Sequence, residues 1–312
     1  MKEIGGYFGL ELGANREYHD TPLRLNTGRN CLEYILKAKG YRKIYLPYYI
    51  CDLILEPLNK LGIDYEFYHV DENLDPVFDK ILDKKEVMLC VNYFGLKQKS
   101  IERLARHNKN LIVDNTQAFF SRPINEIDTF YSARKFFGVA DGAYLYTDRI
   151  TETPFGTDVS YDRMAHLLKR IDLSGEDGYS DFRSNDNALM NQPIRQMSKL
   201  TRSLLSNIDY EKAKLIREQN FMFMHEALQG RNALKFDFDL LNGPMVYPLV
   251  SPSLDLREKM IGHRIYVSTY WLEVLSRVDA HSVEANFVNY LVAIPIDQRY
   301  SQSEMKYILS VI

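Results

Sequence analysis

The chain has 312 residues, of which 46% are hydrophobic and 26% are charged. This is the composition of a globular protein, and it excludes a collagen, a coiled coil and an intrinsically disordered chain. At roughly 100–200 residues per domain, the length predicts two domains. Lys and Arg together number 39 and Asp and Glu 42, so the formal net charge is −3. We therefore expect neither nucleic acid nor an anionic membrane as a partner.

The three cysteines, Cys31, Cys51 and Cys90, do not have the spacing of a zinc site. An odd, sparse set of cysteines is typical of a reducing compartment. Residues 1–7 lack the apolar segment of a signal peptide, and the longest apolar runs, such as 87–91, are much too short to span a bilayer. We therefore expect a cytoplasmic protein without a metal centre.

The first half of the chain alternates helical and strand-like segments. Thr27 is placed to cap a helix that ends at Gly40, and Ser100 is placed to cap a later one. Strands are predicted at 43–46, 65–70, 87–91, 111–113, 128–131 and 143–147, and a further helix at 52–60. Strands separated by helices form a mostly parallel sheet, and ligands bind at the carboxyl ends of its strands.

The second half has a different organisation. Residues 151–191 are rich in Asp, Ser, Gly and Asn, which predicts a partly helical connector. One long helix is predicted at 208–228, a second sheet from strands at 236–240, 245–249, 264–267 and 292–294, and covering helices at 254–261 and 303–311. We expect a large domain over residues 1–200, which includes the connector, and a small C-terminal domain over residues 201–312.

Residues 27–30, Thr-Gly-Arg-Asn, open the first predicted helix. A glycine at this position lets a ligand approach the backbone, and the free N–H groups of the helix start favour an anion such as a phosphate. Arg29 would add a positive charge. By itself this motif favours the alternative, an ordinary helix cap followed by a solvated arginine.

Asp114 follows an apolar strand, and Gln117 lies three residues further on. A buried carboxylate needs a cationic partner, and a protonated heterocyclic nitrogen would serve. The alternative is a loop aspartate that caps the next helix. At the end of another predicted strand, Tyr93 is placed either to line a pocket or to pack the edge of the core.

Lys135 lies 21 residues beyond Asp114 and is followed by Phe136 and Phe137. Desolvation by these rings would lower the pKa of the lysine and make its amine nucleophilic towards a carbonyl compound. A single lysine is more often a solvated surface residue, so the order and spacing of all these features carry more weight than any one of them.

That order resembles the DegT/DnrJ/StrS-type sugar aminotransferases. The matching stretches include Thr-Gly-Arg-Asn at 27–30, Val-Asp-Asn-Thr-Gln-Ala at 113–118 and Ser-Ala-Arg-Lys at 132–135, with others at 46–51, 67–71, 93–95 and 141–142. Looser agreement at 217–220 and 247–249 extends the resemblance over most of the chain. The resemblance implies the α/β fold of the type I PLP-transferases: a mostly parallel sheet with flanking helices, and a smaller C-terminal α+β domain.

Carried over residue by residue, the resemblance implies pyridoxal 5′-phosphate (PLP) as the cofactor. Lys135 would hold it and later move a proton between substrate and cofactor, Asp114 would keep its ring nitrogen protonated, and Gln117 would bond its ring hydroxyl. The residues implied around the phosphate are Gly28, Arg29, Asn30 and Ser132, and those implied against the ring are Tyr49, Cys51 or Tyr93.

The resemblance also implies a homodimer and an aminotransferase reaction. The amino group would pass from a donor such as glutamate to a nucleotide-linked keto sugar, for polysaccharide or natural-product synthesis. The nucleotide's phosphates would need cationic contacts, for which Arg134, Arg183 and Arg195 are available.

Several positions depart from the family pattern. The phosphate-binding serine usually lies further upstream of the lysine than Ser132 does, and Cys51 replaces the ring-stacking aromatic residue. Only 178–183 distantly resembles the segment that reaches a partner's cofactor. Two alternatives therefore stay open: a PLP-dependent dehydratase or other PLP chemistry, and a catalytically inactive binding relative on the same fold.

Overall fold

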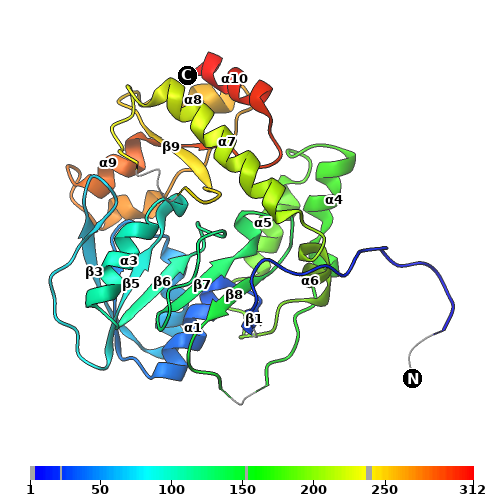
Figure 1. Ribbon diagram of the computed structural model, residues 1–312, viewed down its shortest axis with the longest axis horizontal. Helices are drawn as coiled ribbons and strands as arrows, with labels where there is room; N and C mark the ends of the chain where they lie inside the picture. Colours follow the sequence, from blue (N-terminus) through cyan, green and yellow to red (C-terminus); the bar gives the residue numbers. More distant parts are fainter. Residues whose placement is uncertain (1–3, 22, 152–153, 237–240) are drawn as a thin grey trace.

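The computed structural model describes residues 4–21, 23–151, 154–236 and 241–312 (Figure 1). Its larger part is built on an eight-stranded sheet in the order β1–β8–β7–β6–β5–β2–β3–β4. The strands are β1 Leu23–Leu25, β2 Lys43–Pro47, β3 Asp64–Val70, β4 Pro76–Val77, β5 Glu86–Val91, β6 Leu111–Asn115, β7 Asp128–Ser132 and β8 Ala143–Tyr146. From β3 through β2, β5 and β6 to β7 the pairing is parallel, whereas β1, β4 and β8 pair antiparallel. The mostly parallel sheet that the sequence predicts is confirmed.

Three helices and three short 3-10 turns connect the strands of this sheet. The helices are α1 Gly28–Lys39, α2 Leu55–Leu61 and α3 Gln98–His107, and the turns are η1 Asp52–Ile54, η2 Tyr93–Gly95 and η3 Ala133–Lys135. The predicted caps of α1 are confirmed, because the Thr27 hydroxyl accepts the N–H of Asn30 and Gly40 ends the helix in the left-handed region. The predicted cap at Ser100 is wrong: α3 begins at Gln98, after Asn92 has accepted the N–H of Lys97 at 2.9 Å.

The connector contains η4 Tyr161–Arg163 and the helices α4 Ala165–Asp172 and α5 Tyr179–Ala188, and it leads into α6 Lys199–Leu205. Asp141, which is fully buried, fixes the start of α6. Its carboxylate accepts the backbone N–H and the hydroxyl of Ser198, both at 2.7 Å, and the hydroxyl of Thr201. Next to it, Gly142 has φ +120, and a Cβ there would lie 3.0 Å from Thr201 Cγ2. The sequence Asp-Gly therefore joins the sheet to α6.

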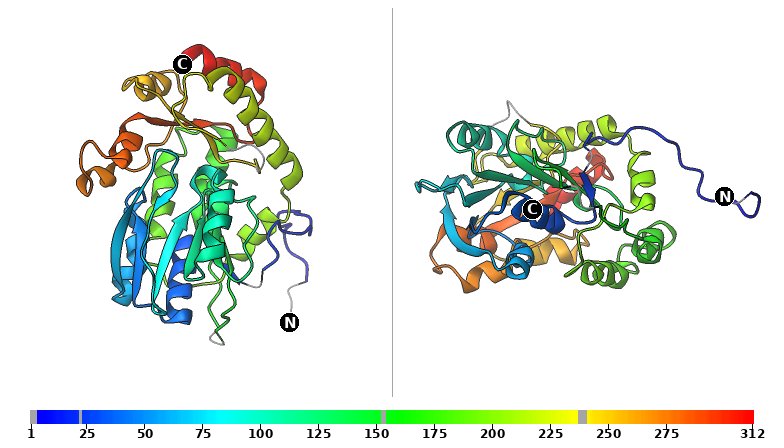
Figure 2. Two further views of the ribbon diagram at one scale, coloured as in Figure 1. Left: turned by 60° about the vertical axis from the view of Figure 1, so that its left-hand side comes forward. Right: turned by 90° about the horizontal axis from the view of Figure 1, so that it is seen from below.

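A smaller part of the chain lies over one end of the large sheet (Figures 1 and 2). Its elements are α7 Tyr210–Leu228, β9 Val246–Val250, α8 Leu256–Gly262, η6 Leu272–Ser276, α9 Val283–Tyr290, β10 Leu291–Pro295 and α10 Gln302–Val311. Antiparallel β9 and β10 form a second sheet, around which a separate apolar core gathers. This core includes Phe221, Tyr247 and Ile294. The domain boundary near residue 200 stays a prediction.

Two of the predicted strands of the second sheet are not found as such. Residues 264–267 run without a partner strand. Ile265 and Val267 are buried while Arg264 and Tyr266 are exposed, so an extended segment along a surface has the same alternation as a strand. Of the predicted strand 236–240, residues 237–240 lie outside the described residues, and Phe236 is not in a strand.

The smaller part is held against the carboxyl ends of the parallel strands. The N–H of Met245 donates to the carbonyl of Phe94, just after β5, at 2.9 Å. Gln298 Nε2 donates to the carbonyl of Phe136, just after η3, at 2.9 Å. The edge of the sheet where ligands are expected is therefore the edge that the smaller part covers.

We predict that Asp141→Ala lowers the free energy of unfolding by about 3 kcal/mol, because a buried carboxylate with three donors is lost and those donors are left without an acceptor. Urea denaturation followed by circular dichroism measures the change. Asp162→Ala, at an exposed position in η4, is the matched control and should leave the unfolding midpoint where it is. Equal midpoints for both variants would contradict this role of Asp141.

Candidate active site

Asp114 lies at the carboxyl end of β6 and is only 7% exposed. Its Oδ1 accepts the backbone N–H of Thr116 at 2.8 Å, and Thr116 is the one described residue that hydrogen-bonds to this carboxylate. Burial raises the pKa of Asp114, while the nearby charge of Lys135 and the bonds from Thr116 lower it. The free chain thus carries a buried carboxylate for which a cation would be a favourable partner.

Lys135 comes from η3, directly after β7. Because β6 and β7 are parallel neighbours, their carboxyl ends bring Lys135 to the side of Asp114. Lys135 Nζ donates to Thr116 Oγ1 at 3.1 Å. Thr116 therefore contacts both the acid and the amine. The sequence shows this threonine inside Asp-x-x-Gln, but its linking role depends on where Lys135 lies.

Lys135 is exposed, whereas Phe136 and Phe137 are buried. The two rings turn into the core and pack against Phe119 and Phe120. The expectation that they desolvate the lysine is therefore wrong. Their contribution is to anchor the turn from which the lysine extends.

The start of α1 lies against the same threonine. A Cβ placed at Gly28 would meet Thr116 Cγ2 at 3.2 Å and the Phe130 ring at 3.5 Å, so the glycine permits this close approach. The N–H of Asn30 is used by the Thr27 cap, whereas the N–H groups of Gly28 and Arg29 have no acceptor among the described residues. A helix N-terminus with two free donors thus lies beside the Asp114–Lys135 pair.

The side chains of Arg29 and Asn30 are engaged elsewhere. Arg29 Nη1 pairs with Glu56 Oε2 at 2.8 Å, and its Nη2 donates to the carbonyl of Leu189 at 2.9 Å. Asn30 Nδ2 donates to Asn26 Oδ1 at 2.6 Å and to a backbone carbonyl. Both side chains therefore have internal partners in the free chain, and their predicted contacts with a phosphate stay predictions.

Two further candidates keep atoms available for a ligand. The hydroxyl of half-buried Ser132 makes no hydrogen bond with any described residue. Gln117 Oε1 accepts the N–H of Phe94 at 2.9 Å, which fixes the side chain and leaves its Nε2 group to donate. The predicted roles of both residues stay predictions.

The three residues implied against a ligand ring differ in access. Tyr49 and Tyr93 are buried, and the Tyr93 hydroxyl donates to the carbonyl of Tyr49 at 2.7 Å. Tyr93 therefore packs at the edge of the core, and its predicted contact with a cofactor stays a prediction. Cys51 is half-buried at the start of η1. Burial raises the pKa of its thiol, whereas the backbone N–H of Leu53 and the charge of Lys135 lower it.

The arginines proposed for nucleotide phosphates are mostly paired. Arg134 forms an ion pair with Asp186, and Arg195 Nη1 lies 3.5 Å from Asp158 Oδ1. Arg183 is exposed on α5. None of the three is distinguished by its position as a phosphate contact.

The donor set fits a small ligand that is cationic at one end and anionic at the other. Asp114 offers a buried carboxylate, Gly28 and Arg29 offer backbone N–H groups, and Lys135 offers an amine between them. PLP has this distribution of charge when its ring nitrogen is protonated. Within the described ranges, no cluster of His, Cys, Asp and Glu suits a metal ion. No helix in those ranges has the length and apolarity to cross a membrane.

No family model and no curated protein matches the sequence. Known structures do match. A DegT DnrJ EryC1 StrS aminotransferase from Brucella abortus is 15% identical, with 93% of this chain and 84% of that chain covered and a TM-score of 0.61. Sugar aminotransferase CalS13 from Micromonospora echinospora is 13% identical, with 93% and 86% covered and a TM-score of 0.64. DesV from S. venezuelae, solved in complex with a ketimine intermediate, is 15% identical, with 93% and 83% covered and a TM-score of 0.64. The chain thus has the fold of these aminotransferases, as the sequence predicts.

We predict that Asp114→Asn stabilises the free chain at neutral pH by about 1 kcal/mol, since stabilising substitutions in strained sites are typically of this size. Asn keeps an acceptor for the N–H of Thr116 but carries no buried charge. Burial raises the folded-state pKa of Asp114, so ionisation destabilises the fold. The advantage of Asn should therefore shrink as the pH falls and Asp114 becomes protonated.

Urea unfolding of both proteins at several pH values measures this. Asp64→Asn, on an exposed residue of β3, is the control and should show no pH-dependent gain. A loss of stability in Asp114→Asn at neutral pH would show that the carboxylate is already well compensated in the free chain.

Proposed function

We propose that this chain is a PLP-dependent aminotransferase that acts on a keto sugar. The observation that carries the proposal is that Thr116 contacts Lys135, Asp114 and the start of α1 together. These groups meet at the carboxyl edge of a sheet whose fold is that of known sugar aminotransferases. The likeness to those structures supports the reaction class, and the donor set supports the cofactor.

When bound, PLP supplies an electron sink that stabilises negative charge on the substrate carbon. Asp114 would hold the proton on the ring nitrogen through its buried carboxylate. The N–H groups of Gly28 and Arg29 would bind the phosphate, together with the Ser132 hydroxyl. Gln117 Nε2 would donate to the ring hydroxyl, and Cys51 would lie against the ring.

Lys135 would hold the cofactor before the reaction and carry a proton to and from the reacting carbon during it. Its exposed position in the single chain leaves it free to move between these tasks. Thr116 would return the amine to a fixed place through the hydrogen bond to Nζ. Water at the site would compete for the proton that Lys135 moves, so we propose that a second copy of the chain covers the site in a homodimer.

The finer details rest on the resemblance. We propose a nucleotide-linked sugar as acceptor, an amino acid such as glutamate as donor, a role in polysaccharide or natural-product synthesis, and a cytoplasmic location. One observation favours the alternative of a non-catalytic binding protein: Arg29 and Asn30 are tied to internal partners. The presence of Lys135 beside Asp114 is the stronger observation, because binding alone needs no amine there.

We predict that the purified protein takes up PLP and shows a visible absorption band, and that reduction with borohydride attaches the cofactor to Lys135. Peptide mapping identifies the labelled lysine. Lys135→Ala should lose the band and lower the transamination rate by at least about a thousandfold, since both covalent binding and proton transfer are removed.

Lys212→Ala, on an exposed position of α7, is the matched control and should retain both. A label on another lysine would show that the site is wrongly assigned. A protein that stays colourless in excess PLP would contradict the cofactor. Release of a keto product without amine transfer would assign an elimination instead.

We predict that Thr116→Val lowers kcat roughly fivefold while KM for the sugar stays unchanged, because one hydrogen bond to the amine is lost. Val keeps the Cγ2 contact with Gly28 but has no hydroxyl. Thr116→Ser, which keeps the hydroxyl, should recover most of kcat. Val keeps the methyl group and lacks the hydroxyl, whereas Ser keeps the hydroxyl and lacks the methyl group. A loss in Thr116→Ser as large as in Thr116→Val would therefore show that the hydrogen bond to the amine does not account for the role of Thr116.

A further inference from the structure

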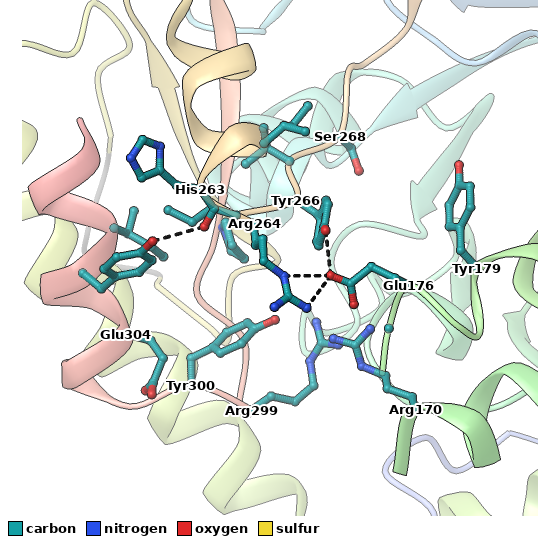
Figure 3. A pocket seen from close by; sticks show the side chains of 17 residues that line it. Arg170, Glu176, Tyr179, His263, Arg264, Tyr266, Ser268, Arg299, Tyr300 and Glu304 are labelled. Atoms are coloured by element: carbon teal, nitrogen blue, oxygen red, sulfur yellow. Dashed lines mark hydrogen bonds and ion pairs between the residues drawn. The ribbon is translucent and has the colours of Figure 1, made fainter. Parts of the chain in front are cut away.

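A large cavity lies between the connector and the smaller part of the chain (Figure 3). Its volume is about 1040 Å³, which is enough for a ligand of nucleotide size. One wall comes from Arg170, Glu176 and Tyr179, and the other from residues 261–268 together with Arg299 and Tyr300. The connector and the smaller part of the chain thus both contribute to the cavity.

Three donors converge on one carboxylate oxygen in this cavity. Glu176 Oε1 accepts Arg264 Nε at 2.9 Å, Arg264 Nη2 at 2.7 Å and the Tyr266 hydroxyl at 2.8 Å. Figure 3 shows Arg264 and Tyr266 pointing at Glu176 from the opposite wall. These bonds hold the pKa of Glu176 at about 2, with Tyr266 as the largest cause, so the group is an anion at all physiological pH values. A fork of donors around one oxygen is the arrangement that recognises a carboxylate or a phosphate.

Of three other charged residues in the cavity wall, two have partners of their own among the described residues and one does not. Arg299 is neutralised by Asp297, with contacts of 2.6 and 2.8 Å. Glu304 is used at the start of α10, where it accepts the N–H of Ser301 at 2.7 Å. Arg170 forms no ion pair with the described residues, and its Nη1 would lie 2.6 Å from a Cβ on Gly175, next to Glu176. An uncompensated cation therefore lies beside the Glu176 loop.

The Glu176–Arg264 pair is easy to open. The side chains of Arg264 and Glu176 are 73% and 40% exposed, and ion pairs that are this exposed are weak. The two residues are far apart in the sequence and belong to separate parts of the chain. A ligand with more negative charge than one carboxylate would gain both Arg264 and Arg170 when it displaced Glu176.

We propose that Arg264, Tyr266 and Arg170 form a subsite for an oxyanion of the substrate, and that Glu176 occupies this subsite in the free protein as an internal competitor. The subsite rests on the proposed function insofar as the ligand is a substrate. Two sources share this chemistry: the phosphates of a nucleotide-linked sugar and the carboxylate of an amino donor. Three tyrosines, Tyr179, Tyr266 and Tyr300, add flat faces for the rest of the ligand.

Titration calorimetry with the full chain tests this proposal, with pyrophosphate, UDP and glutarate as probes. Glu176→Ala should bind at least one probe roughly tenfold more tightly than the unmodified chain, because a charge-assisted competitor is gone. Arg264→Ala and Arg170→Ala should each bind that probe more weakly. Glu226→Ala, which removes an exposed glutamate of α7 outside the cavity, is the matched control and should bind as the unmodified chain does.

The probes separate the two sources. A gain for pyrophosphate and UDP alone assigns the subsite to phosphates, and a gain for glutarate alone assigns it to a carboxylate. If Glu176→Ala binds every probe as weakly as the unmodified chain, or more weakly, Glu176 is not a competitor and the proposal is overturned. Arg264→Ala with unchanged affinity would overturn it as well, and Tyr266→Phe provides a milder check on the same donor fork.

The same protein samples distinguish failure of this proposal from failure of the proposed function. Formation of the Lys135 adduct without any effect at Glu176 would remove the competitor and leave the aminotransferase. An effect at Glu176 without the adduct would keep the oxyanion subsite and remove the cofactor.

Discussion

The buried carboxylate of Asp114 is the constraint on which the candidate active site depends. A charge at the end of a buried strand costs stability unless a cation and hydrogen bonds compensate it. In the free chain, Thr116 supplies the hydrogen bonds and Lys135 supplies a nearby positive charge. This compensation is partial, since burial still keeps the pKa of Asp114 raised. A cationic ring beside Asp114 would complete this compensation.

Contacts between neighbouring elements of the fold assemble this site. Parallel pairing of β6 and β7 sets Asp114 and Lys135 side by side, and the absence of a side chain at Gly28 lets α1 approach Thr116. The same edge holds the smaller part of the chain, because the carbonyls of Phe94 and Phe136 accept hydrogen bonds from it. Arg217, fully buried in α7, adds to this attachment because its Nη2 donates to the carbonyl of Phe136 at 3.5 Å. Movement of the smaller part would therefore act directly on the turns that position the site.

The cavity between the connector and the smaller part carries a second cluster of polar side chains. Its polar fork depends on the segment 264–267, which has the alternation of a strand but no neighbouring strand. The buried side chains of this segment pack on the core of the smaller part, and its exposed side chains face Glu176. The segment therefore offers side-chain donors on its exposed side, where the edge of a sheet would offer backbone groups. The connector does not belong to the alternating strands and helices of the large sheet. It supplies the carboxylate of Glu176, which accepts hydrogen bonds from these donors. Substrate recognition and domain contact would thus use the same side chains.

The sequence by itself determined the parallel sheet, the caps of α1 and the order of Asp114 and Lys135. These depend on local periodicity and on residues close in the chain, which one sequence displays directly. Only the tertiary structure decided that Arg29 pairs with Glu56, that Tyr93 is enclosed in the core and that Arg264 meets Glu176. Each of these outcomes joins elements remote in sequence, and no local pattern specifies which long side chain finds which partner. The physical reason is that charge pairing and burial depend on packing in space, whereas helix and strand patterns depend mainly on the nearest neighbours along the chain.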